Sequence, residues 1–241
     1  MCSSDLVVEF GVYSTTQEGT PTYLARVLFL YDVLDNFVLN GQISNNKKGE
    51  ITLLKKALQS DIPDESIIIL DRGFGYMSTI LALADRGLEF AVRFSTNSLF
   101  AKRILSRNLD DQIVTWEPTM YELKKAKARK QILRPITVRV TRIQLKSGDV
   151  ELVVSSLVDL EKYRYDEVKE LYHYRWPVEE GFKNLKPKMK IEQFGARKPE
   201  GILQEFYAHI FIMNLIALFG QVADKQIRNK TINRKYEYKY N

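Results

Sequence analysis

A short apolar run, Ser66–Leu70, is the feature that most constrains the fold of this chain. The run ends abruptly at Asp71, and a continuous apolar segment of this length is typical of a strand buried on both faces. An apolar helix is predicted over Tyr76–Arg86, stopped by Gly87, and a further strand over Leu88–Phe94. Asp71 is therefore predicted at the carboxyl end of a buried strand, where its side chain emerges at the edge of a rigid sheet.

Two more strands are predicted upstream of this run. Leu24–Leu34 and Asn36–Ile43 are apolar, rich in β-branched residues and separated by a turn at Asp35-Asn36. Glu50–Gln59 follows as a short helix. With the elements above, the order strand–strand–helix–strand–helix–strand predicts an α/β fold, a ribonuclease-H-like mixed sheet with flanking helices.

The pattern changes after residue 95. Strands are predicted at Ile113–Trp116, Ile136–Leu145 and Glu151–Leu157, and we interpret residues 96–158 as a β-rich insertion in the sheet. Within it, the basic run Glu122–Arg134 is interpreted either as a solvated loop or as a DNA contact, with the two given equal weight.

The chain then returns to helices, predicted at Tyr165–Lys186 and Pro199–Arg228. The predicted division is 1–95 for the first part of the core, 96–158 for the insertion, 159–228 for the C-terminal helices of the core and 229–241 for a basic, disordered tail.

Composition narrows the classes of function. The net charge of +6 and the pI of about 9.2 favour a polyanionic partner without identifying one. With Cys2 as its one cysteine and two dispersed histidines, the sequence predicts neither an internal disulfide nor a zinc site, and a reducing cytosol is the expected location. The apolar run Ile210–Gly220 is too short to span a bilayer.

Four side chains are predicted on one helix face: Tyr172, Arg175, Glu179 and Lys186. At about 100° of rotation per residue they fall within an arc of roughly 60°. Glu179 would supply a hard oxygen ligand for a divalent metal, and the two cations would supply counter-charge for phosphates. The alternative is a solvated face with an Arg175–Glu179 ion pair. Pro177 threatens the continuity of this helix unless it begins a new segment.

The same residues resemble the signature of IS4-type DDE transposases: Tyr172, Arg175, Glu179 and Lys186, with Trp176 after the arginine. A second similarity lies in I-I-I-L-D-R-G-F-G-Y at 67–76, which resembles the strand that carries the second catalytic aspartate of the family. The resemblance extends from about Phe10 to about Phe219. It implies a transposase that cuts and joins double-stranded DNA with two Mg²⁺ (or Mn²⁺) ions, acting as a homodimer on DNA in the nucleoid of a bacterial or archaeal cytosol.

On this resemblance, Asp71 and Glu179 are the predicted catalytic residues and metal ligands. For Asp71, a turn or helix-cap role is the alternative. The predicted DNA-binding residues are Tyr172, Arg175, Lys183, Lys186 and Trp116. A lone tryptophan in a strand is more often a core residue, so base stacking is the minor interpretation of Trp116.

The family's first catalytic aspartate has no clear counterpart. Asp5 lies without an apolar run before it, and Asp32 is better explained by a structural role. We therefore expect an upstream strand to be missing and the chain alone to be a weak or inactive nuclease. The alternative function is a catalytically incompetent remnant that binds DNA or a full-length transposase.

Overall fold

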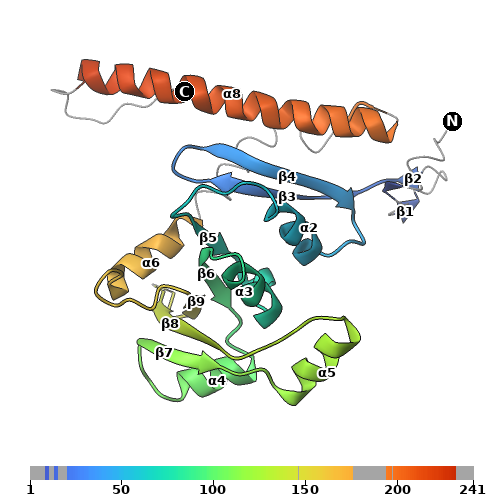
Figure 1. The fold of residues 1–241 in the computed structure, drawn as a ribbon. Helices are drawn as coiled ribbons and strands as arrows, with labels where there is room; N and C mark the ends of the chain where they lie inside the picture. The colour runs from blue at the N-terminus through green and yellow to red at the C-terminus, as the bar shows by residue number, and fades with distance from the viewer. Residues whose placement is uncertain are drawn as a thin grey trace. The chain divides into compact units, whose positions relative to one another are not determined.

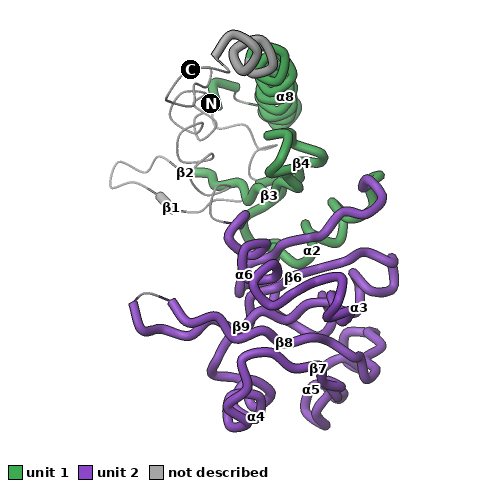
Figure 2. The backbone as a smooth tube through the Cα atoms, turned by 90° about the vertical axis from the view of Figure 1, so that its left-hand side faces the viewer, with its two compact units in different colours: residues 1–61, 178–241 green, residues 62–177 purple. Residues whose placement is uncertain are grey.

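The computed structural model describes residues 9–10, 14–15, 21–145, 147–175, 194–196 and 198–231 (Figure 1). The chain forms two compact units (Figure 2). The first combines Met1–Asp61 with Val178–Asn241, and the second is Ile62–Pro177.

The first unit is built on an antiparallel hairpin of β3 (Ala25–Asp32) and β4 (Phe37–Asn45). Asn36 adopts a positive φ of 57° in the connecting turn, a conformation that asparagine tolerates well. The Asp32 carboxylate accepts hydrogen bonds from the backbone N–H groups of Leu34 and Asp35, at 2.9 and 3.2 Å. Asp32 therefore has a turn-stabilising role. The short helix α2 (Glu50–Ala57) packs on this hairpin, and β1 (Ser14–Thr15) pairs with β2 (Pro21–Thr22).

The long helix α8 (Pro199–Thr231) runs along the same hairpin (Figure 1). Phe206 is fully buried and stacks on Phe29, with ring centroids 5.6 Å apart. The Asn214 amide bonds both backbone groups of Val38, accepting from its N–H at 2.8 Å and donating to its carbonyl at 3.0 Å. Gly41 allows this close approach, because a Cβ there would lie 2.3 Å from Ile210 Cδ1. Helix α8 is thus held against β4 by close packing at Gly41 and by the hydrogen bonds of Asn214.

The opposite side of α8 is apolar and exposed, with Phe211 67% and Phe219 64% accessible. By length and composition, Pro199–Ala223 could cross a membrane, with a mean hydropathy of 1.6. The apolar stretch is therefore longer than the predicted run Ile210–Gly220. One such helix is weak evidence for a membrane span, since core helices share this composition.

The second unit contains a five-stranded mixed sheet with the order β5-β6-β9-β8-β7. Its strands are β5 (Ile67–Leu70), β6 (Glu89–Phe94), β7 (Asp111–Trp116), β8 (Ile136–Gln144) and β9 (Val150–Ser155). β5 and β6 are parallel and the other pairs are antiparallel. The flanking helices are the 3₁₀ helix η1 (Arg72–Phe74), α3 (Met77–Ala84), α4 (Leu99–Leu105), α5 (Met120–Ala128) and α6 (Tyr165–His173). This architecture confirms the predicted α/β fold class.

The β5-α3-β6 unit forms as its sequence predicts. Helix α3 ends at Ala84, and the turn after it contains Gly87 with a φ of +68°, where the Leu88 N–H donates to the Leu83 carbonyl at 3.1 Å. This is the capping pattern that glycine favours after a helix. The chain then enters β6, in which Phe90, Ala91 and Val92 are at most 1% exposed.

The strands of the predicted insertion belong to the same sheet as β5 and β6. β9 pairs directly with β6, with Ala91 opposite Ser155 and Arg93 opposite Val153. This pairing satisfies the hydrogen-bonding groups on the second edge of the buried strand β6. No local sequence pattern indicates that β9 is the partner of β6. The sheet therefore continues across the predicted boundary at residue 95.

Part of the basic run Glu122–Arg134, interpreted as a loop, is helical. Helix α5 begins with a capping box, in which the Thr119 hydroxyl accepts from the Glu122 N–H and the Glu122 carboxylate accepts from the Thr119 N–H. The many lysines favoured a loop in the sequence interpretation. The capping box and the residues of high helix propensity that follow it determine the helix.

The helix predicted over Tyr165–Lys186 is not continuous. Helix α6 ends at His173, and Tyr174 lies in a turn. Pro177 offers a reason, because proline has no N–H to donate to the His173 carbonyl and disfavours a helical residue before it. The part of the predicted face beyond Arg175 lies outside the described residues.

A buried ionic cluster connects β7, β8 and the segment leading to α6. The side chain of Arg139 is 1% exposed and donates two hydrogen bonds to Asp111, from Nε to Oδ1 at 2.9 Å and from Nη2 to Oδ2 at 2.6 Å. It also donates to the carbonyls of Leu157 and Tyr163. Thr141 donates to the same carboxylate at 3.0 Å. All three guanidinium nitrogens therefore donate hydrogen bonds, and the group holds the sheet to the chain after β9.

We expect Asp111→Asn to destabilise the second unit by about 3–5 kcal/mol, because it leaves the Arg139 charge buried without a counter-ion. The neighbouring Asp110 provides the control. Its carboxylate is 73% exposed and lies 3.8 Å from Arg142, so Asp110→Asn should cost less than about 1 kcal/mol. Urea unfolding of both variants measures the difference, and equal losses would show that burial of the pair is not decisive.

Candidate active site

The register of the sheet brings three charged side chains to one face at one end of the strands. Leu70 lies opposite Val92, so the next residue, Asp71, follows in register with Arg93. On the other edge of β6, Arg93 lies opposite Val153, and Glu151 is two residues away on the same face of β9. Asp71, Arg93 and Glu151 therefore form a row across three adjacent strands.

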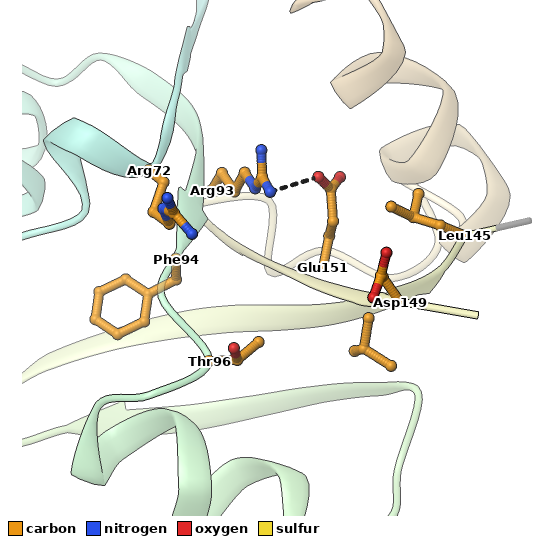
Figure 3. A pocket seen from close by; sticks show the side chains of 8 residues that line it. Arg72, Arg93, Phe94, Thr96, Leu145, Asp149 and Glu151 are labelled. Carbon is orange, nitrogen blue, oxygen red and sulfur yellow. Dashed lines mark ion pairs between the residues drawn. The ribbon is translucent and has the colours of Figure 1, made fainter. Parts of the chain in front are cut away.

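Arg93 lies between the two carboxylates. Its Nη1 is 3.6 Å from Asp71 Oδ1. Its Nη2 is 3.0 Å from Glu151 Oε1, the pair marked in Figure 3. The Glu151 side chain is 14% exposed, Arg93 28% and Asp71 49%. The inner pair is thus short and shielded, whereas the pair with Asp71 is longer and open to water.

Asp71 occupies the first position of the turn that follows β5. It is the N-cap residue that precedes η1, with extended backbone, yet its side chain makes no capping hydrogen bond within the described part of the chain. The turn packs tightly on β6, because a Cβ on Gly75 would lie 2.9 Å from the Arg93 carbonyl oxygen. The carboxylate is consequently held near Arg93, and the turn does not use it in a capping hydrogen bond.

Tyr172 covers the same sheet face from α6. Its side chain is 5% exposed and packs with Ala91, Ile143 and Val153. The guanidinium of Arg175 lies over its ring, 5.8 Å from the centroid. Both residues therefore lie beside the row of charges, although Tyr172 is much more buried than a DNA-contacting side chain was expected to be.

The Tyr172 hydroxyl is buried and finds no hydrogen-bond partner among the described residues. Burial raises the pKa of this hydroxyl well above its ordinary value, and the carboxylates of Asp71 and Glu151 act in the same direction. Arg175 and Arg93 oppose the rise in pKa. The hydroxyl therefore stays protonated at neutral pH.

A pocket of about 210 Å³ opens next to this row. Figure 3 shows its charged side chains converging from β6, β9 and the segments beside them. Its lining is Arg72, Arg93, Phe94, Thr96, Leu145, Asp149, Val150 and Glu151. The pocket thus combines two guanidinium groups and two carboxylates beside Asp71, which suits an ionic ligand.

The other predicted site residues have different outcomes. Trp116 is 3% exposed and packs with Phe94 and Phe100, at centroid distances of 5.0 and 4.6 Å. Its ring offers no open face to a base, so its position fits the core interpretation rather than DNA binding. Glu179, Lys183 and Lys186 lie outside the described residues.

Sequence reasoning missed Arg93 and Glu151. A signal was present, since Arg93 is the charged residue near the end of the otherwise buried strand E-F-A-V-R-F. A charge in such a strand needs a partner. The partner could not be read from the sequence, because Glu151 is brought to it by strand pairing with a distant segment.

Comparison with known proteins shows the family of this chain. The sequence matches the family model described as "Transposase DDE domain" over residues 7–215. The chain belongs to the DDE transposase family. It is also 21% identical over 206 residues to transposase InsG for insertion sequence element IS4 of Escherichia coli (strain K12). These matches confirm the IS4-type resemblance of the sequence.

The match covers 83% of this chain and 46% of the InsG sequence, so the chain spans about half the length of that relative. DDE transposases typically use divalent metal ions. The Asp71 carboxylate is half-exposed and makes no capping hydrogen bond among the described residues. It fits such a ligand role, since hard cations prefer oxygen ligands. Among the residues that the structure describes, no three His, Cys, Asp or Glu side chains gather around one point.

We expect Tyr172→Phe to leave the free energy of unfolding within about 1 kcal/mol of wild type, or to raise it, because the variant removes a buried hydroxyl without a described partner. Tyr172→Ala should cost about 3–5 kcal/mol, because it removes a packed ring. Urea unfolding tests both. A large loss in the phenylalanine variant would mean that the hydroxyl has a structural bond.

Proposed function

We propose that this chain is the catalytic domain of an insertion-sequence transposase that cuts and joins DNA strands by metal-dependent hydrolysis and transesterification. The observation that carries the proposal is the Asp71 carboxylate, held at the end of β5 with no capping role among the described residues, in a chain of the DDE family. The IS4 relative is named as a transposase of an insertion sequence element, which supports the same role.

Asp71 and Glu179 are the proposed metal ligands, and two Mg²⁺ ions are the expected cofactor. Bound metal would supply Lewis acidity and a reactive oxygen nucleophile for phosphodiester chemistry. The protein's own part is to hold these carboxylates on rigid elements and to keep counter-charge close to them. Asp71 is fixed by the tight contact of η1 with β6, as the Gly75 environment shows.

DNA is the proposed partner. Arg175, Lys183 and Lys186 are the proposed phosphate contacts, and Tyr172 would support Arg175, whose guanidinium lies 5.8 Å from the centre of its ring. The net charge of +6 favours such a partner. A homodimer acting on paired DNA ends in the cytosol belongs to the same proposal.

Mn²⁺ titration of the purified chain tests the metal site. Binding is expected to be lost, or weakened at least tenfold, in both Asp71→Asn and Glu179→Gln, because each removes one anionic ligand with little change in shape. Asp64→Asn is the control, since Asp64 is an exposed aspartate on the loop before β5. If the two site variants bind Mn²⁺ as well as the control does, the proposed metal site is wrong.

The same experiment separates the alternative function. A chain that binds DNA but shows no Mn²⁺ binding sensitive to Asp71 would act as a DNA-binding remnant rather than an enzyme. Plasmid nicking in Mn²⁺ that disappears in Asp71→Asn would instead support catalysis by this chain.

Salt dependence tests the DNA contacts. Lys186→Ala should reduce the slope of log K against log salt by about 0.9, the value expected for one lost phosphate contact on duplex DNA. Lys56→Ala, which removes an exposed lysine on α2, should leave the slope unchanged. Equal slopes for Lys186→Ala and wild type, measured by fluorescence anisotropy, would exclude Lys186 from the interface.

A further inference from the structure

The unequal ion pairs of Arg93 have a consequence for any cation that binds at Asp71. A divalent cation placed on the Asp71 carboxylate would lie close to the guanidinium, and like charges at such distances repel. In the structure, Arg93 already has a closer partner in Glu151, at 3.0 Å rather than 3.6 Å. The guanidinium can therefore give up Asp71 without becoming unpaired.

We propose that Arg93 and Glu151 act as a counter-charge pair that sets the affinity of Asp71 for divalent cations. Without a bound cation, the Arg93 guanidinium pairs with the Asp71 carboxylate. When a cation binds Asp71 instead, the guanidinium keeps its ion pair with Glu151. Both are positioning residues, because they act on the metal ligand and not on substrate. This inference rests on the proposed function, in which Asp71 binds metal.

The surroundings of Arg93 support a limited movement of its head group. Its backbone is fixed, because β6 is paired on both edges and Val92 on one side and Phe94 on the other are buried. Its side chain is 28% exposed and borders the open pocket. The planar guanidinium has five N–H donors, so one group can contact two carboxylates from a fixed stem.

The proposal predicts opposite effects for two substitutions. Arg93→Met removes the competing charge and should raise the affinity for Mn²⁺ roughly two- to fivefold, the range that a partly exposed ion pair supports. Glu151→Gln removes the second anchor, so Arg93 binds Asp71 more tightly, and the affinity should fall by a similar factor. A purely structural role would weaken binding in both variants.

The double variant gives the sharpest test. Without the Arg93 guanidinium, Glu151 has no ion-pair partner in this row. The double variant Arg93→Met/Glu151→Gln should therefore bind Mn²⁺ with the same affinity as Arg93→Met alone. Simple long-range electrostatics would instead let Glu151→Gln lower the affinity equally in both backgrounds. Non-additivity therefore separates a coupled pair from independent charges.

Two control variants remove a nearby charge without breaking the pair. Arg72→Met removes the other guanidinium of the pocket, and Asp149→Asn removes its other carboxylate. Each should change Mn²⁺ affinity less than the matching substitution at Arg93 or Glu151. Affinity is measured on the full chain by the paramagnetic resonance of free Mn²⁺, and urea unfolding confirms that every variant is folded.

The outcomes distinguish this inference from the proposed function. If Asp71→Asn does not weaken Mn²⁺ binding, the proposed metal site and this inference both fail. If it does, but Arg93→Met and Glu151→Gln shift the affinity in the same direction or add in the double variant, only this inference is overturned. If Arg93→Met does not fold, Glu151→Gln still decides: unchanged affinity, or a loss no larger than that of Asp149→Asn, contradicts the proposal.

Discussion

The second unit depends on β6, which is paired on both edges and covered on both faces. Phe90, Ala91 and Val92 have almost no accessible surface, and the strand pairs in parallel with β5 and antiparallel with β9. A strand of this kind cannot shift by one residue, because a shift would turn its apolar side chains and its charged residue to the wrong faces. The register of β6 therefore decides which side chains meet at the site.

Two features of that register matter for chemistry. The parallel pairing brings Asp71, just past the end of β5, level with Arg93, and the antiparallel pairing brings Glu151 from a segment nearly 60 residues later. Helix α6 then places Tyr172 over the same face, against Ala91 and Val153. Asp71, its counter-charge and a buried hydroxyl are thus assembled by strand pairing and helix packing and not by proximity in sequence.

The sequence was sufficient where local signals are strong. The run before Asp71, the helix stopped by Gly87 and the α/β class could all be predicted, because apolar length and glycine position act within a few residues. The pairing of Arg93 with Glu151 could not, since it follows from contacts between distant strands. Pro177 indicated that the helix predicted over Tyr165–Lys186 could be interrupted, but not that α6 ends at His173. Helix α5 was not predicted, because the lysine-rich run was interpreted from its charge.

The balance of charge in the row shows how a second carboxylate changes the surroundings of Asp71. Asp71 and Arg93 alone would be a neutral pair, with little attraction for a cation. With Glu151 the three groups carry a net charge of −1, and the shielded Glu151–Arg93 pair takes most of the guanidinium's interaction. The half-exposed Asp71 carboxylate then keeps its negative charge available to solvent while remaining positioned by a weak contact. An arginine next to the Asp71 carboxylate need not abolish cation binding, provided that a second, largely shielded carboxylate holds the guanidinium.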